Sequence, residues 1–249
     1  MKHDNIIAKR SNKIIYRDGD SCVKLFAENF SKQDVLNEAL NQARVETTGL
    51  NIPGVRAVTV IDGKWAIAFD LIEGETLAQL MANDPKNKHH YIDLLVDIQM
   101  DIHKHSCAHL NRLKEKMSRK IGAADLDHYT RYELLSRLEA MPKHLKLCHG
   151  DICPSNIIIS KDGTPYVIDW AHATQGNASA DVARTYLVFC LSGDEEAAKY
   201  YLDRFCEKSG TDKRYVQSWM PIVAASQSVK GRPEERDLLM SWINVVDWQ

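Results

Sequence analysis

Alternating apolar and polar positions fill the first third of the chain and predict short strands. Four runs are rich in β-branched and aromatic residues, namely Lys13–Tyr16, Ser21–Phe26, Val55–Ile61 and Lys64–Leu71. The turns Asp18-Gly19-Asp20 and Asp62-Gly63 separate the members of each pair, as is typical of hairpins. This part of the chain therefore predicts two hairpins.

Between the two predicted hairpins, the spacing of apolar residues changes to that of a helix. We expect a helix over residues 32–48, with Ser31 as its N-cap and Gly49 as its stop. Its apolar stripe would consist of Val35, Leu36, Ala39, Leu40 and Ala43. This is the one main helix predicted among the strands.

After Glu73-Gly74 the chain becomes mostly helical. Apolar residues recur at helical spacing at Tyr91, Leu94, Leu95, Ile98 and Ile102, and again at Leu134, Leu135 and Leu138. From about Ala180 onward the pattern is also helical. We therefore expect an α+β chain with a small β-rich part at 1–71, a larger helical part at 72–249 and a crossover at 70–76.

Composition and charge narrow the class of protein. The 249 residues are 44% hydrophobic and 27% charged with a net charge of -2, so we expect no nucleic-acid partner. The N-terminus lacks the apolar stretch of a signal peptide, and no run approaches the ~20 apolar residues of a membrane span. The six scattered cysteines form no CxxC pair, which favours a reducing cytoplasm. The basic run Arg112, Lys114, Lys116, Arg119 and Lys120 predicts a solvated helix face.

The strongest chemical signal is the stretch from Leu147 to Trp170. Ile157–Ile159 and Tyr166–Ile168 can pair across the turn at 161–164, which brings Asn156 and Asp169 together at one end of a hairpin. An amide oxygen and a carboxylate there suit Mg²⁺. Asp151, on the loop that leads into the hairpin, can accept a proton from a hydroxyl, and phosphoryl transfer needs these three groups.

The same stretch resembles the catalytic loop and metal-binding Asp of the aminoglycoside phosphotransferase and choline kinase superfamily. Val23-Lys24-Leu25-Phe26 resembles the phosphate-binding strand of that family, Asn37-Glu38-Ala39 its lysine-pairing helix, and residues 71–77 its hinge. The resemblance implies a two-lobed protein-kinase-like fold. It also implies a nucleotide-binding lobe at 1–71, an acceptor-binding lobe at 72–249, and Mg²⁺ and ATP, or GTP, as cofactors.

Carried over residue by residue, the resemblance implies roles for nine residues. Lys24 would hold the α- and β-phosphates, Glu38 rather than Glu46 would orient Lys24, and Ser11 and Glu73 would also contact the nucleotide. Asp151 would be the base on a loop supported by His149, and Asn156 and Asp169 would bind Mg²⁺. Asp181 resembles a family Asp that braces the loop, although an acid at a helix start is the simpler interpretation. The chain departs from the pattern in having no glycine-rich loop before Lys24.

The sequence does not decide which compound accepts the phosphoryl group. Only eleven residues separate Asp169 from Asp181, which leaves no room for a protein-kinase activation segment, so we expect a small hydroxyl compound and no protein partner. Scattered acids in the helical part suit an aminoglycoside, whereas tryptophans suit choline or ethanolamine, with Trp170 nearest the metal Asp. The acids are Asp194, Glu195, Glu196, Asp203, Glu207, Glu234, Glu235 and Asp237; the other late tryptophans are Trp219, Trp242 and Trp248. A pseudokinase or a non-enzymatic nucleotide-binding module is the alternative class.

Overall fold

A computed structural model describes residues 5–10 and 12–243 of the chain. These residues form two compact units. The N-terminal unit contains the described residues of Met1–Asn83 together with Pro154–His172, and the helical unit contains those of Asp84–Cys153 and Ala173–Gln249.

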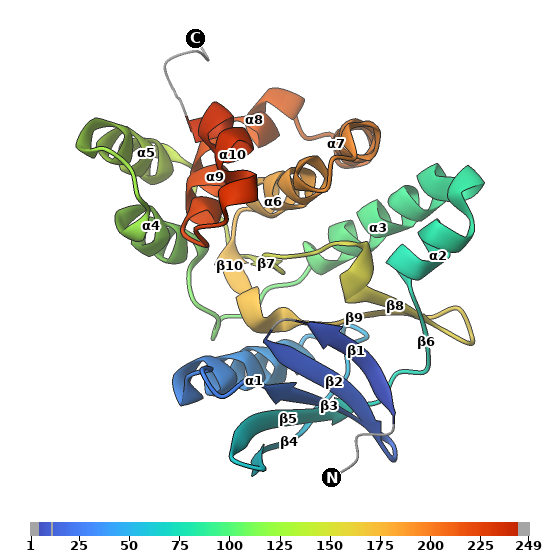
Figure 1. The fold of residues 1–249 in the computed structure, drawn as a ribbon. Helices are drawn as coiled ribbons and strands as arrows, with labels where there is room; N and C mark the ends of the chain where they lie inside the picture. Colours follow the sequence, from blue (N-terminus) through green and yellow to red (C-terminus); the bar gives the residue numbers. More distant parts are fainter. Residues whose placement is uncertain (1–4, 11, 244–249) are drawn as a thin grey trace. The chain divides into compact units, whose positions relative to one another are not determined.

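The N-terminal unit is built on a five-stranded antiparallel sheet with the order β1-β2-β3-β5-β4 (Figure 1). Its strands are β1 (Ile6–Arg10), β2 (Lys13–Asp18), β3 (Ser21–Phe26), β4 (Val55–Ile61) and β5 (Lys64–Asp70). The last four confirm the predicted runs, and Gly19 and Gly63 take the positive φ that the two hairpin turns require. β1 was not among the predicted strands.

Helix α1 (Lys32–Glu46) packs on β4 and β5 and covers one face of this sheet (Figure 1). Ser31 caps it as predicted, since its side chain accepts a hydrogen bond from the Asp34 N–H at 3.0 Å. Phe26 and Ile67 from the sheet form one core cluster with Val35 and Ala39 from the helix.

The predicted apolar stripe of α1 is wrong in three of its five members, because Leu36 is 43% exposed, Leu40 is 49% exposed and Ala43 is also exposed. Their places on the buried face are taken by polar residues with definite partners. Asn41 donates to the Ala171 carbonyl at 3.1 Å, and Gln42 donates to the Pro53 carbonyl at 2.6 Å. Buried polar groups that are hydrogen-bonded in this way are tolerated, so hydrophobicity alone did not indicate the buried face.

The rest of the N-terminal unit contains the predicted motif hairpin. β8 (Ile157–Ser160) pairs with β9 (Pro165–Val167), with Ile157 opposite Val167, and β6 (Gly74–Thr76) adds a third strand beside β8. Short helical segments complete the unit: α2 (Leu77–Asn83), η2 (Pro154–Asn156) and η3 (Trp170–His172). The hairpin from the motif therefore folds together with the N-terminal strands.

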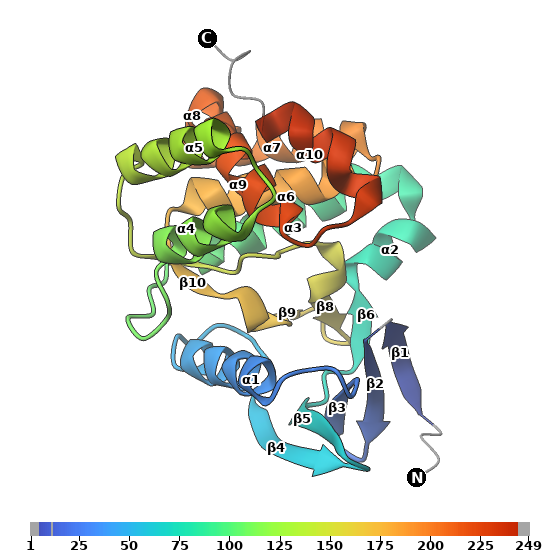
Figure 2. The same ribbon diagram turned by 60° about the vertical axis from the view of Figure 1, so that its left-hand side comes forward.

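The helical unit is arranged around α6 (Ala178–Leu191), which packs against α7, α8 and α9 (Figure 2). The other helices are α3 (Lys88–Ile102), α4 (Leu113–Ala123), α5 (His128–Ala140), α7 (Glu195–Ser209), α8 (Lys213–Gln217), α9 (Met220–Ser228) and α10 (Arg236–Ile243), with the one-turn segments η1 (Pro85–Asn87) and η4 (Pro233–Glu235). A two-stranded ladder joins β7 (Lys146–Cys148) to β10 (Thr174–Gly176). Among the helices of the described residues, none has the length and apolar character to cross a membrane.

The prediction that the basic run of residues 112–120 is a solvated face holds for Arg112 and Arg119, which are exposed. It is wrong for Lys114, Lys116 and Lys120, which are half-buried. Lys114 donates to the carbonyls of Glu139 and Met141 at 2.7 and 2.9 Å, which holds α4 to the end of α5. Lys116 and Lys120, one helical turn apart, are both half-buried, because α4 packs against α9 on that side. Charge and spacing alone do not tell which way a lysine-rich helix face is turned.

Candidate active site

A buried ion-pair cluster lies between β3, α1 and the end of the motif hairpin. Lys24 is 5% exposed, forms an ion pair with Glu38 and lies with its Nζ 3.0 Å from Oδ1 of Asp169. Burial by itself would lower the pKa of Lys24, but the negative charges of Asp169 and Glu38 raise it above its ordinary value. The structure thus brings Lys24, Glu38 and Asp169 together.

The helix geometry explains the choice of Glu38 over Glu46. Lys24 and Phe26 lie on the sheet face that α1 covers, and Glu38 is one of the buried residues on the facing side of α1. Glu46 is exposed, and its carboxylate instead accepts a hydrogen bond from the Val55 N–H at 2.8 Å.

A second lysine at this cluster was missed by the sequence reasoning. Nζ of Lys13 lies 3.6 Å from Oδ2 of Asp169. Burial, followed by the positive charge of Lys24, lowers the pKa of Lys13. The pairing of β2 with β3 could have predicted this position. Lys13 is opposite Phe26, and Phe26 lies two residues after Lys24 on the same strand, so Lys13 and Lys24 share one face of the sheet.

Asn156 and Asp169 meet at one end of the hairpin, as the pairing predicted. The Ile168 N–H donates to the Asn156 carbonyl at 3.0 Å, which fixes the residue before Asp169 beside Asn156. Asp169 itself has φ 65°, a left-handed conformation that turns the chain sharply into η3. An amide oxygen and a carboxylate at one place are hard donors that fit Mg²⁺, so these residues could hold that ion.

The loop that carries Asp151 is held from inside the helical unit. Asp181 on α6 has a fully buried carboxylate that accepts hydrogen bonds from the N–H groups of His149 at 3.1 Å and Gly150 at 2.6 Å. His103 donates to the same carboxylate at 3.0 Å. Burial by itself would raise the pKa of Asp181, but the hydrogen bond and charge of His103, together with His149 and the Gly150 N–H, lower it below its ordinary value. The prediction that Asp181 braces the loop is confirmed.

Two more hydrogen bonds hold the loop at Asp151 and Ile152. The fully buried His149 accepts the Asp151 N–H at its Nδ1, 3.2 Å away. Thr185 donates to the carbonyl of Ile152 at 3.0 Å, so α6 holds the loop on both sides of Asp151. His149 therefore supports the backbone that positions Asp151.

Asp151 has one charged partner that the sequence reasoning did not identify. Nη2 of Arg184 on α6 lies 2.9 Å from Oδ1 of Asp151, whose side chain is 33% exposed. Arg184 follows Asp181 by three residues and so lies on the same face of the helix, which is the signal that could have found it.

Three other residues were predicted to contact the nucleotide or the acceptor, namely Glu73, Trp170 and Ser11. Glu73 is paired with Arg17 at 2.9 Å and Lys161 at 2.6 Å, and these hydrogen bonds, first that of Lys161, lower its pKa. Trp170 is fully buried and donates to the Val167 carbonyl at 3.0 Å, so its ring is part of the core and cannot face a ligand. Ser11 lies outside the described residues.

The sequence matches the phosphotransferase enzyme family over residues 8–218. The chain belongs to this family. No curated protein sequence matches it.

Solved structures of phosphotransferases share the fold at low sequence identity. Aminoglycoside phosphotransferase APH(4)-Ia is 16% identical with a TM-score of 0.68, covering 96% of this chain and 90% of its own. Choline kinase LicA from Streptococcus pneumoniae is 16% identical with a TM-score of 0.63, covering 95% and 91%. An aminoglycoside-3'-phosphotransferase of type VIII is 15% identical with a TM-score of 0.61, covering 90% and 89%. The predicted α+β architecture, a five-stranded sheet with one helix followed by a mostly helical part, is confirmed.

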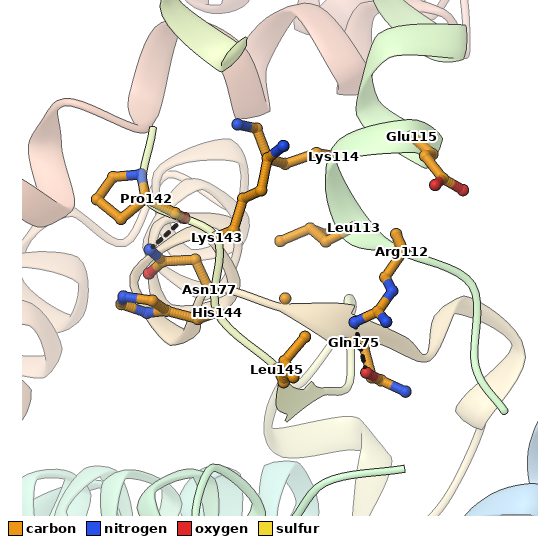
Figure 3. Close-up of a pocket in the computed structure, with 11 residues that line it drawn as sticks. Arg112, Leu113, Lys114, Glu115, Pro142, Lys143, His144, Leu145, Gln175 and Asn177 are labelled. Atoms are coloured by element: carbon orange, nitrogen blue, oxygen red, sulfur yellow. Dashed lines mark hydrogen bonds between the residues drawn. The ribbon is translucent and has the colours of Figure 1, made fainter. Parts of the chain in front are cut away.

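The helical unit also contains a hollow of about 390 Å³ (Figure 3). The start of α4, the segment 142–145 and the junction of β10 with α6 line it. Arg112 bonds Gln175 across one side at 2.8 Å, and Asn177 bonds the Pro142 carbonyl at 3.5 Å on another. None of the predicted catalytic or nucleotide-binding residues lines this hollow.

Proposed function

We propose that this member of the phosphotransferase family is a Mg²⁺-dependent kinase that transfers the γ-phosphoryl group of ATP, or GTP, to a hydroxyl of a small acceptor. The observation that carries the proposal is the buried pairing of Lys24 with Glu38 and Asp169. Burying a lysine with two carboxylates carries a desolvation cost that their attraction need not repay, so stability alone is a weak reason for such a cluster and a functional site is the better one. The family match over residues 8–218 supports this interpretation.

In this proposal the N-terminal unit binds the nucleotide. Lys24 would hold the α- and β-phosphates while Glu38 keeps its ammonium group in place, and Lys13 adds a second positive charge beside Asp169. Asn156 and Asp169 would hold Mg²⁺, which neutralises phosphate charge when bound. Glu73 and Ser11 stay proposed nucleotide contacts. The neighbours APH(4)-Ia and LicA have been crystallised with ADP or AMP-PNP and with AMP, respectively.

Asp151 would act as the base. Its carboxylate orients the acceptor hydroxyl and takes its proton as the oxygen forms a bond to the γ-phosphorus and the bond to the β-phosphate oxygen breaks, which releases ADP. The bracing of its loop by Asp181 supports this role, because misplacement of a reacting group by about 1 Å can cost roughly 10²-fold in rate.

The acceptor in this proposal is a small molecule. Only eleven residues lie between Asp169 and Asp181, and they are used by η3 and β10 before α6 begins at Ala178. That is too short for a platform on which an extended peptide could lie. The similar structures include an aminoglycoside phosphotransferase and a choline kinase at the same 16% identity, so similarity favours neither acceptor.

The test is an ADP-release assay with Mg²⁺ and ATP or GTP, run with aminoglycosides, choline, ethanolamine, sugars, hydroxy acids and generic protein substrates. We expect acceptor-dependent ADP release with at least one small alcohol, none with proteins, and loss of the signal in Asp151→Ala. Nucleotide binding without turnover on any acceptor would favour the alternative of a pseudokinase. Labelling of protein serine, threonine or tyrosine with no small-molecule turnover would refute the proposal.

A further inference from the structure

Four cationic side chains in the helical unit gather around Asp151. Arg184 touches it directly at 2.9 Å. The other three are Lys116 and Lys120, which α4 turns inward, and Lys230, which follows α9. The negative charge of Asp151 acts on each of these three lysines and offsets part of the lowering of its pKa by burial.

The lysines are close enough to disturb one another's ionisation. Burial, and then the positive charge of Lys120, lowers the pKa of Lys116 to about 7, although Asp181 and Asp151 oppose the shift. Burial and the charges of Lys230 and Arg184 lower the pKa of Lys120. Burial and Arg184 do the same to Lys230, with smaller effects of Arg232 and Glu235. Positive charges so close together are unfavourable in the free protein and become favourable when an anion binds among them.

The guanidinium group of Arg184 is buried and only partly hydrogen-bonded. Its side chain is only 14% exposed, and while Nη2 bonds Asp151, the buried Nη1 has no hydrogen-bond partner within the described part of the chain. A buried donor of a charged group costs free energy when it is left unpaired. A guanidinium with one nitrogen on the base and another unsatisfied is suited to an anionic group next to the reacting hydroxyl.

Five of the eight acids expected to attract a polycation are paired with cations. Asp194 and Glu196 pair with Lys88 at 2.7 and 3.0 Å, and Glu235 pairs with Arg232 at 2.8 Å. Asp203 and Glu207 also have cationic partners, in Lys213 and Arg204. The cationic side chains around Asp151 would themselves repel an aminoglycoside or a quaternary amine.

We propose that the acceptor is an anionic alcohol, whose carboxylate or phosphate group is bound by Lys116, Lys120, Arg184 and Lys230 while its hydroxyl faces Asp151. This inference rests on the proposed kinase function and narrows its acceptor to one charge class. The anion would also draw Arg184 toward itself and so leave the carboxylate of Asp151 available for the hydroxyl.

The test compares alcohols that share a carbon framework and differ in charge. One set is glycerol, 3-amino-1,2-propanediol, glycerate and glycerol 3-phosphate; the other is glucose, glucosamine, gluconate and glucose 6-phosphate. We expect kcat/KM for anionic members to exceed that for neutral members by about tenfold or more, as one charge-assisted hydrogen bond would give, with cationic members lowest. The carboxylate and phosphate arms tell which anion is preferred. A preference for neutral or cationic members overturns the proposal.

A double variant, Lys120→Gln with Lys230→Gln, separates acceptor binding from nucleotide binding. We expect KM for the anionic acceptor to rise about tenfold or more while KM for ATP stays within about twofold. Lys213→Gln is the matched control, since it removes a cation of the same unit that pairs with Asp203 away from Asp151. A rise in KM for ATP instead of the acceptor would assign these lysines to the nucleotide and overturn the proposal.

A binding measurement makes the test independent of turnover. Inorganic phosphate, glycerate and gluconate are titrated into the protein with Mg²⁺ and AMP-PNP present, and we expect binding in wild type that the double variant loses. No binding of any of these anions overturns the inference. Preferred phosphorylation of kanamycin or choline would also overturn it while leaving the kinase function intact, whereas anion binding without transfer to any alcohol would contradict the kinase function instead.

Discussion

Substitution of Asp181 by Asn tests how the loop of Asp151 is held. The carboxylate of Asp181 is fully buried and accepts the N–H groups of His149 and Gly150, on different oxygens, as well as Nε2 of His103. Asn offers one carbonyl oxygen and would leave at least one of these donors unpaired. An unpaired buried donor costs about 1–3 kcal/mol, and removing one partner of a buried charged network costs about 3–5 kcal/mol.

We therefore expect Asp181→Asn to lower the free energy of unfolding at pH 7 by about 3 kcal/mol. With a urea dependence of about 1–3 kcal/mol per M, the unfolding midpoint would fall by about 1–3 M. Hydrogen exchange of the Gly150 amide should become faster by about 10²-fold, because its acceptor is lost. The kcat of phosphoryl transfer should fall together with this loss of order, since the loop positions Asp151.

The matched control is Asp203→Asn, which removes an acid from an exposed pair with Lys213. Exposed pairs contribute about 0–1 kcal/mol, so this variant should unfold close to wild type. The reasoning is refuted if Asp181→Asn has the urea midpoint and the Gly150 exchange rate of wild type, because the loop would then be held by other contacts.

Three further predictions concern the proposed chemistry. Asp151→Ala should reduce transfer by roughly 10²–10⁴ while calorimetry shows nearly unchanged Mg²⁺-ATP binding; wild-type turnover would remove Asp151 from the mechanism. Asp169→Ala should abolish the enhancement of ATP binding by Mg²⁺, and a retained enhancement in calorimetry would show that Asp169 is not a ligand. The affinity for the anionic acceptor should fall as the pH rises from 6 to 8, because the pKa of Lys116 is about 7 and its ammonium loses a proton in that range. Lys116→Met should flatten this dependence, and an identical profile in that variant would contradict the assignment.

Local sequence patterns were sufficient for the elements and for the order of the motif. The alternation of residues predicted the strands β2 to β5, and Ser31 indicated where α1 begins. The hairpin of Ile157–Ser160 and Pro165–Val167 followed from two apolar runs around a turn, and its pairing brought Asn156 to Asp169. These features depend on backbone conformation and on residues near in sequence, so they can be predicted without knowledge of the tertiary structure.

The short strands β1, β6, β7 and β10 were not predicted. Three of them contain only three residues each, too few for a period of two to be recognised. β6 pairs with β8, which is more than 80 residues away in the chain, so its partner strand and not its own sequence makes it a strand. The predicted division into lobes at 1–71 and 72–249 stays a prediction. The compact units of the structure group Pro154–His172 with the first strands.

The sequence by itself determined the secondary structure of the long elements, the phosphotransferase motif and the order of its reactive groups, because each is encoded within a few residues. Only the tertiary structure decided which faces those elements bury. It turned Glu38 toward Lys24 and left Leu36 and Leu40 exposed, brought Lys13 to Asp169, and turned Lys116 and Lys120 inward beside Arg184 and Asp151. The physical reason is that the orientation of a charged side chain depends on the partners and the burial it finds across the fold, and these are set by segments far apart in the chain.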